Sequence, residues 1–216
     1  MFRLRFEVTA ASLVLLSVCP LEGDDLRSRA EGGDATAQHA LALLYEEGKA
    51  EPQDYKEAAT WYRRAAEQGH AAAQANLGVL YAQGLGVPQD AGEAARLFRL
   101  AAEHGNAMAQ FNLGVFYDSG QGAPEDNREA VRWYREAAEQ GYPAAQLNLG
   151  IMYREGQGVD SDNVAAYMWF LLAEKNGVEH AGRMLDMMEL DDEDEIYADE
   201  IALAKKLAEE WAASHE

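Results

Sequence analysis

The stretch AQANLGVLYAQGLGVPQDAGEAARLF at residues 73–98 recurs, with substitutions, as AQFNLGVFYDSGQGAPEDNREAVRWY at residues 109–134. The offset is 36 residues, and the same offset links positions along most of the chain. It relates a glycine, a leucine and a tyrosine in successive units: Gly33, Gly69, Gly105, Gly141 and Gly177; Leu41, Leu77, Leu113, Leu149 and Leu185; Tyr45, Tyr81, Tyr117 and Tyr153. Self-similarity at one fixed period is the sequence signature of a repeat architecture. The repeat therefore decides the fold.

Each unit reads as two helices joined by a turn. In the first unit one helix is expected at about residues 35–47, where Leu41 and Tyr45 are four apart and share a face. A Gly-x-Gly turn follows in later units, and then a proline and an aspartate. Glutamate stands three residues after Asp54, Asp90 and Asp126, which is the capping-box pattern for the start of a second helix. The glycine of the next unit ends that helix.

Glycine also recurs inside the first helix, at Gly78, Gly114 and Gly150. Glycine in a helix interior costs about 1 kcal/mol against alanine. We therefore expect another helix backbone to pass close at this position. The aromatic residues of the second helices, among them Trp61, Trp133 and Trp169, are expected in the core between repeats.

These residues resemble the Sel-1-like repeat (SLR) family, a relative of the tetratricopeptide repeats. The resemblance is carried by AQANLG at residues 73–78, YAQGLGV at residues 81–87 and EAARLF at residues 93–98. It implies an all-α, right-handed α/α solenoid of about four 36-residue helix-turn-helix repeats. The repeats are expected at about residues 33–68, 69–104, 105–140 and 141–176, within a single domain of residues 24–216. Unit one departs from the pattern, because Ala42 and Ala50 replace two of its glycines.

The pattern decays at both ends. Residues 24–32 look like the tail of a second helix, with Ala30 in register with Ala66. Residues 177–216 are expected to form a C-terminal cap, in which Asp186 replaces the mid-helix glycine and an amphipathic helix closes the solenoid. Terminal repeats with a polar outer face are what a solenoid requires.

Composition narrows the functional classes. The chain has 216 residues, 40 of them alanine, which favours closely packed helices. Eighteen Lys and Arg against 38 Asp and Glu give a formal charge of −20. So acidic a chain is poorly suited to bind nucleic acid or anionic membranes. Partners that carry Lys or Arg should be steered toward it.

The N-terminal segment at residues 1–23 resembles a secretory signal peptide. Arg3 and Arg5 precede an uncharged stretch at residues 8–18, a length that suits a signal rather than a transmembrane span. We therefore expect a periplasmic or secreted protein. Two alternatives stay open: a lipoprotein signal that ends at Cys19, and an apolar helix that caps the fold of a cytoplasmic protein.

The sequence offers no catalytic, cofactor or metal motif. Cys19 is the single cysteine, so an intrachain disulfide and a multi-cysteine zinc site are both excluded. The Gly-x-Gly turns lack the third glycine or the Lys-Ser/Thr pair of phosphate-binding loops. The acidic run at residues 191–195 lacks the glycine and the closing glutamate of a calcium loop. We expect no cofactor and no metal.

The resemblance maps a concave groove to one face of the first helices. Eight residues of that face are candidate partner contacts: His39, Glu46, Met108, Phe111, Asp118, Leu147, Arg154 and Glu155. Met108, Phe111 and Leu147 are expected to form an exposed apolar patch with a charged rim, which is typical of a contact surface. The alternative is that adjoining helices cover Phe111 and Leu147.

Two classes of function follow from the resemblance. The first is a non-enzymatic adaptor that holds a protein or peptide segment with Lys or Arg and apolar anchors. The second is an enzyme, because cysteine-rich relatives in bacteria are linked to penicillin binding and hydrolysis. Those relatives carry a cysteine pair in each repeat and this chain has none, so the resemblance does not carry that activity across.

Overall fold

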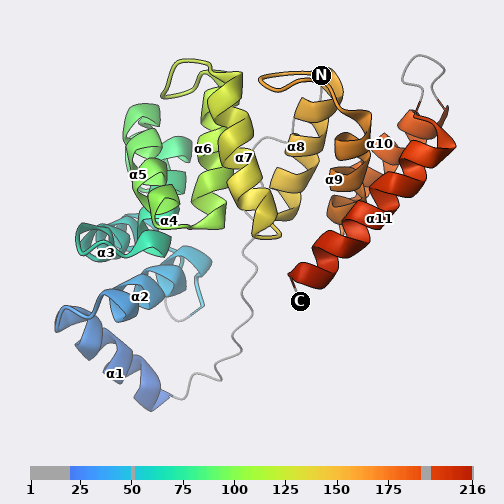
Figure 1. Ribbon diagram of the computed structural model, residues 1–216. Coiled ribbons are helices and arrows are strands. Elements are labelled where there is room, and N and C mark those ends of the chain that lie inside the picture. Colours follow the sequence, from blue (N-terminus) through green and yellow to red (C-terminus); the bar gives the residue numbers. More distant parts are fainter. Residues whose placement is uncertain (1–19, 50–51, 191–195, 216) are drawn as a thin grey trace. The chain divides into compact units, whose positions relative to one another are not determined.

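The computed structural model describes residues 20–49, 52–190 and 196–215, and within these ranges every regular element is a helix. Cys19 lies outside the described residues, and so does the predicted signal peptide except for residues 20–23. The expected helix pairs are confirmed (Figure 1). The first helices of the repeats are α2 (Ala35–Glu47), α4 (Ala71–Gln83), α6 (Ala107–Ser119) and α8 (Pro143–Glu155); the second helices are α3 (Tyr55–Glu67), α5 (Ala91–Glu103), α7 (Asn127–Glu139) and α9 (Asn163–Lys175).

Three further helices flank the repeats: α1 (Pro20–Glu31), α10 (Glu179–Leu190) and α11 (Ala198–Ser214). The described helices fall into two compact units, which are considered separately. The N-terminal unit holds α1 to α5 and the first turn of α6, and the C-terminal unit holds the rest of α6 and α7 to α11.

The aspartates expected to cap the second helices do so. Asp54 Oδ1 accepts hydrogen bonds from the backbone N–H groups of Lys56 and Glu57, and Asp90 Oδ1 accepts one from Glu93. The reciprocal half of the capping box is not made at Asp90, because the Asp90 backbone N–H donates to the carbonyl oxygen of Tyr81 at 3.0 Å. The Glu93 carboxylate instead accepts two hydrogen bonds from the Arg96 guanidinium, at 2.7 and 2.8 Å. The first helices end at glycines in the left-handed conformation: Gly48, Gly84 and Gly156.

The glycine inside each first helix faces an aromatic ring. A Cβ atom at Gly114 would lie 2.6 Å from Cδ1 of Tyr134, and the same distances at Gly78 and Gly150 are 2.7 Å to Phe98 and 2.6 Å to Phe170. We expected a helix backbone here; the nearest group is instead a ring on the second helix of the same repeat, although at Gly150 the backbone carbonyl oxygen of Ala166 also lies 3.2 Å from the Cβ position. Only hydrogen leaves room for that ring against the first helix.

The second glycine of the turn makes a different contact. Gly86 has φ +69°, and a Cβ there would lie 2.2 Å from the backbone carbonyl oxygen of Tyr55, at the start of the preceding second helix. Gly158 meets Asn127 in the same way. The turn of one repeat therefore packs on the backbone of the repeat before it, which explains why glycine recurs there.

A ladder of buried glutamines joins the helices. Gln38 donates from Nε2 to the carbonyl of Ala30, and Gln74 and Gln146 donate to the equivalent carbonyls one repeat back. Glutamine Oε1 atoms at this register accept from the C-cap residue of the following second helix: Gln68 to Gln38 at 2.7 Å, Gln140 to Gln110 at 2.6 Å and Asn176 to Gln146 at 3.0 Å. The residue equivalent to these donors in the second repeat is His104, which has no side-chain amide. Gln74 Oε1 is buried without a partner.

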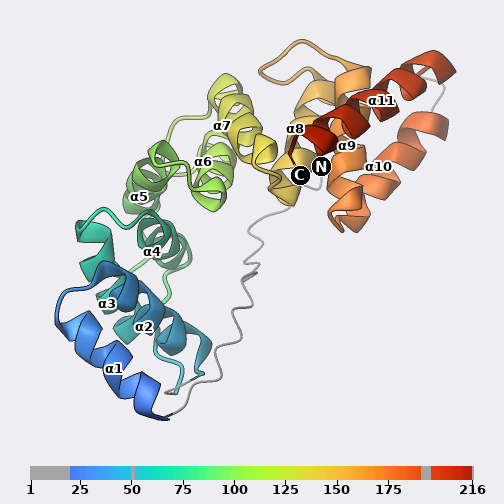
Figure 2. The same ribbon diagram turned by 60° about the horizontal axis from the view of Figure 1, so that its bottom comes forward.

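The apolar residues expected in the core are buried. Leu113 is 0% exposed, and Trp61, Trp133 and Trp169 are 6–7% exposed. In the C-terminal unit α9 contacts both α10 and α11 and lies between them (Figures 1 and 2). Trp211 of α11 meets Trp169 edge to face at 6.0 Å between ring centroids. The closing helix expected from the sequence is thus α11, packed on the last second helix.

The glycine contact yields a paired prediction. Gly114→Ala should lower the free energy of unfolding by about 1–3 kcal/mol, because its methyl group overpacks against the Tyr134 ring. Gly92, an exposed helical glycine of α5, is the control, since a Cβ there would lie 3.4 Å from its nearest neighbour, a carboxylate oxygen of Asp90. Gly92→Ala should raise stability by about 0.5–1 kcal/mol through helix propensity. Urea unfolding of the two variants measures both, and equal effects would contradict this account.

The gap in the glutamine ladder yields a second prediction. His104→Gln supplies an amide donor for Gln74 Oε1 and should stabilise the protein by about 0.5–1.5 kcal/mol. The converse change, Gln140→His, removes such a donor and should destabilise it by a similar amount. Thermal and urea unfolding check both. A neutral His104→Gln combined with a neutral Gln140→His would show that the ladder contributes no stability.

Candidate functional site

Two of the candidate residues, His39 and Glu46, belong to a half-buried polar cluster in the N-terminal unit. Tyr62 of α3 donates its hydroxyl proton to a carboxylate oxygen of Glu46 on α2. The same hydroxyl oxygen accepts from Asn76 Nδ2 of α4 at 3.1 Å. Asn76 Nδ2 also lies 3.2 Å from His39 Nε2, and the His39 ring stacks on His70 at 4.8 Å between centroids. We call these five residues the α2–α4 polar cluster.

The hydrogen bonds fix where the imidazole protons sit. Asn76 Nδ2 can only donate, so His39 Nε2 accepts and the neutral ring carries its proton on Nδ1. His70 Nδ1 accepts from the backbone N–H of Ala73 at 3.2 Å, so this ring carries its proton on Nε2. The cluster therefore retains one further N–H donor on each imidazole.

Burial shifts the ionisation of the cluster. It lowers the pKa of His39 to about 4, and the neighbouring His70 adds to the effect. It also raises the pKa of Glu46, although the hydrogen bond from Tyr62 opposes that shift. The pKa of the Tyr62 hydroxyl is raised, first by burial and then by the Glu46 carboxylate. At neutral pH the His39 imidazole is therefore suited to donate and accept hydrogen bonds rather than to carry charge.

In the C-terminal unit the exposed apolar patch expected at Phe111 and Leu147 is absent. Both side chains are 1% exposed. Phe111 packs against the rings of Tyr134 and Tyr142, at 5.9 and 5.1 Å between centroids, and Leu147 belongs to the core cluster around Phe170. The expectation of exposure was wrong because the second helix and the next repeat cover this face. Met108 is half-buried.

The charged candidates of this unit differ in exposure. Asp118 is 7% exposed and accepts a hydrogen bond from the Tyr134 hydroxyl at 3.4 Å. This contact is equivalent to the Glu46–Tyr62 contact two repeats earlier. Arg154 is half-buried and Glu155 is exposed in the last turn of α8. Of the predicted rim, Arg154 and Glu155 therefore reach solvent and Asp118 does not, and the predicted apolar centre is core.

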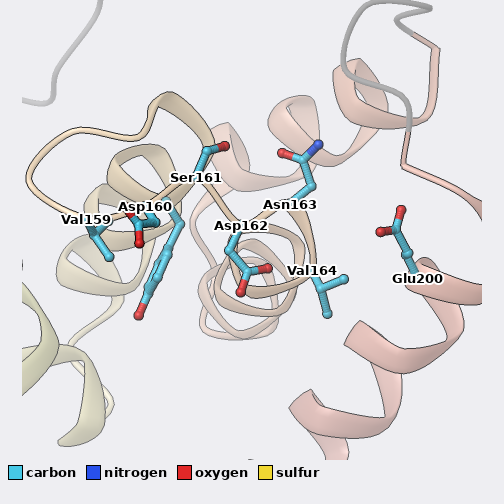
Figure 3. A pocket seen from close by; sticks show the side chains of 8 residues that line it. Val159, Asp160, Ser161, Asp162, Asn163, Val164 and Glu200 are labelled. Atoms are coloured by element: carbon cyan, nitrogen blue, oxygen red, sulfur yellow. The ribbon is translucent and has the colours of Figure 1, made fainter.

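An open cavity of about 490 Å³ lies at the turn between α8 and α9 (Figure 3). Its wall includes three carboxylates: Asp160, Asp162 and, from α11, Glu200. Asp162 Oδ1 caps α9 through the N–H of Ala165 at 2.9 Å, and Glu200 accepts from the N–H of Tyr197 at 3.0 Å. Two of the three carboxylates therefore serve helix starts, and the cavity pairs no general acid with a base.

A serine does meet a histidine near the end of α11, but the pair is not an activated nucleophile. Ser214 Oγ lies 2.8 Å from His215 Nδ1. Nδ1 also lies 2.7 Å from the carbonyl oxygen of Trp211, which can only accept, so Nδ1 carries a proton and cannot act as the base. Across residues 20–49, 52–190 and 196–215, no three His, Cys, Asp or Glu side chains gather as a set of metal ligands. No helix of these ranges is long and apolar enough to cross a membrane.

Comparison with known families now places the chain. The Sel1 repeat model matches four consecutive segments, residues 35–70, 71–106, 107–142 and 143–178. The chain therefore belongs to the Sel1 repeat family, a class of helical repeat scaffolds. The matched segments begin two residues after the boundaries expected from the sequence. No curated protein matches the chain.

Solved structures agree with this assignment. A Sel1 repeat protein from Oxalobacter formigenes is 33% identical with a TM-score of 0.74, over 91% of this chain and 76% of that one. The protective antigen c5321 of uropathogenic Escherichia coli, which displays an SLR fold, is 41% identical with a TM-score of 0.73, over 76% of this chain. The match spans 35% of the antigen, about a third of its length. The Helicobacter pylori cysteine rich protein B is 24% identical with a TM-score of 0.50, a likeness of fold alone.

Sequence reasoning missed three members of the α2–α4 polar cluster: Tyr62, His70 and Asn76. The repeat register carried a usable signal. At the register of His39 the later repeats hold Ala75, Phe111 and Leu147, so a histidine there departs from an apolar row. The partners come from α3, from the N-cap of α4 and from the middle of α4, which a single-helix view does not include.

The depressed pKa of His39 gives a pH-dependent prediction. The unfolded chain protonates this histidine near its ordinary pKa of 6.5, whereas the folded chain resists protonation until about pH 4. Stability contributed by the neutral ring is therefore present above the unfolded pKa and lost as pH falls toward 4.

We expect the stability difference between the natural protein and His39→Gln to shrink by about 1 kcal/mol from about pH 7.5 to about pH 5.5, a value reduced for partial exposure. Glu46 is present in both proteins, so its contribution cancels to first order. Urea unfolding at the two pH values measures the difference. A pH-independent difference would contradict the assignment.

Proposed function

We propose that this chain is a non-enzymatic scaffold that binds a protein or peptide segment on the faces of its first helices. The observation that carries the proposal is the contrast between registers. Glycine, leucine and glutamine repeat at the positions that hold the helices together, whereas the last turn of the first helices varies in charge and size, through Glu46, Ala82, Asp118 and Arg154. In a repeat scaffold, residues that differ between units and face solvent, as Glu47 and Glu155 do, can serve a partner.

The charge of the chain supports a partner that carries Lys or Arg. The formal charge is −20, and Glu47 and Glu155 are exposed at one register of the first helices. Acidic side chains on a rim raise the association rate and select oppositely charged partners. Each unit offers its own contact surface, with the α2–α4 polar cluster in one and the charged last turn of α8 in the other.

We further propose that the protein acts in the bacterial envelope or outside the cell. The support is the signal-like N-terminal sequence and the likeness to an E. coli protein described as a protective antigen. Capture from separate envelope and soluble fractions of the source cell tests this together with binding.

The test uses the full chain as bait beside two matched variants. Glu47→Gln/Glu155→Gln changes the first-helix faces, and Glu67→Gln/Glu139→Gln makes the same charge change at exposed ends of second helices. We expect the first variant to capture about tenfold less of each specific partner, or less still, because loss of a charge contact costs about 1.4 kcal/mol or more. The second variant should capture as much as the natural protein. Equal loss in both would indicate attraction by net charge alone, and no specific capture by any bait would overturn the scaffold proposal.

A further inference from the structure

The large apolar side chains that the described residues expose are all found near the C-terminus. They are Met187 (48% exposed), Leu190 (83%), Tyr197 (59%) and Leu203 (47%). Met187 and Leu190 are three residues apart in the last turns of α10, so they lie on one side of that helix. We call these two residues the α10 apolar surface. It lies outside the first-helix faces of the four Sel1 repeats.

The repeat register shows that this exposure is unusual. Met187 stands at the register of Val79, Val115 and Ile151, each of which is 9% exposed. Leu190 stands at the register that holds a charged residue in three of the four repeats: Glu46, Asp118 and Arg154. A leucine that is 83% exposed at an otherwise charged register is not required by the packing of the repeat.

The charge around this surface specifies what could cover it. The described residues 186–190 and 196–203 include four Asp and Glu and no Lys, Arg or His. Asp186 and Glu189, which flank Met187 and Leu190 in α10, are both exposed. A second copy of this chain would bring a second Asp186 and Glu189 to the contact, and like charges there would oppose association. Lys or Arg beside apolar side chains would instead satisfy both features.

We propose that the α10 apolar surface docks a basic amphipathic segment of a partner protein. Apolar side chains of the segment cover Met187 and Leu190, and its Lys or Arg side chains face Asp186 and Glu189. The C-terminal end of α10 is held in place for this contact, because Met188 packs in one core cluster with Ile196, which precedes α11, and with Ile201, in the first turn of α11. This is a second contact surface, separate from the one proposed on the first helices.

The test uses a synthetic amphipathic peptide with leucine on one helical face and lysine on the other. The reference peptide keeps every lysine and replaces the leucines with serine. Calorimetry or fluorescence anisotropy at physiological ionic strength measures binding to the full chain. We expect the leucine peptide to bind about tenfold or more tightly than the serine peptide, because apolar area is covered only by the former.

The protein variants separate apolar docking from general attraction. Met187→Ser/Leu190→Ser should weaken the leucine peptide by about tenfold or more and leave the melting curve unchanged, since both side chains are exposed. Glu67→Gln/Glu139→Gln, a charge change at exposed ends of second helices and outside both proposed surfaces, should bind as the natural protein does. Equal binding of both peptides, unchanged binding by the serine variant, or no binding would each overturn the proposal. So would a dimer in light scattering that the serine variant abolishes.

Discussion

The repeat depends on one steric constraint, the contact of a helical glycine with an aromatic ring. Gly78, Gly114 and Gly150 let Phe98, Tyr134 and Phe170 reach the first helix of their own repeat, at distances that exclude a Cβ atom. The contact sets the separation of the two helices in these three pairs, whereas Ala42 stands at the glycine's register in the first repeat. It costs helix propensity, about 1 kcal/mol per glycine, and is offset by burial of a whole aromatic side chain. At the end of the array Asp186 takes the glycine's register, so the same approach is closed to another ring.

Polar contacts then relate one pair to the next. In two of the repeats a buried glutamine of the first helix, Gln38 or Gln146, spans the carbonyl end of the previous helix and the end of its own second helix. The Gly-x-Gly turn adds a contact to the preceding repeat through Gly86 and Gly158. These groups satisfy helix ends that would otherwise be buried without hydrogen bonds. Within each unit the same few positions therefore carry stability, and the other positions are available for function.

That division explains which sequence predictions succeeded. Period, helix pairs, caps and core could be read from the sequence, because each depends on residues close in the chain or on a repeated register. The caps at Asp54 and Asp90 are local hydrogen bonds, and the buried leucines follow a 36-residue spacing. The partner-binding surface was harder to predict from the sequence. Phe111 and Leu147 differ from other units in the way that a binding residue would, yet they are core, because variation in a register does not reveal what packs above it.

The sequence by itself determined a Sel1 repeat protein of paired helices, strongly acidic, with a distinct C-terminal end. Those properties follow from composition and from a pattern that repeats along the chain. Only the tertiary structure decided that His39 stacks on His70 and shares a network with Tyr62, and that Met187 and Leu190 are exposed while Phe111 is not. The physical reason is that exposure and side-chain partnership depend on neighbours from other helices. A register fixes where a residue stands on its own helix, and the packing of the adjoining helices fixes whether solvent or another side chain faces it.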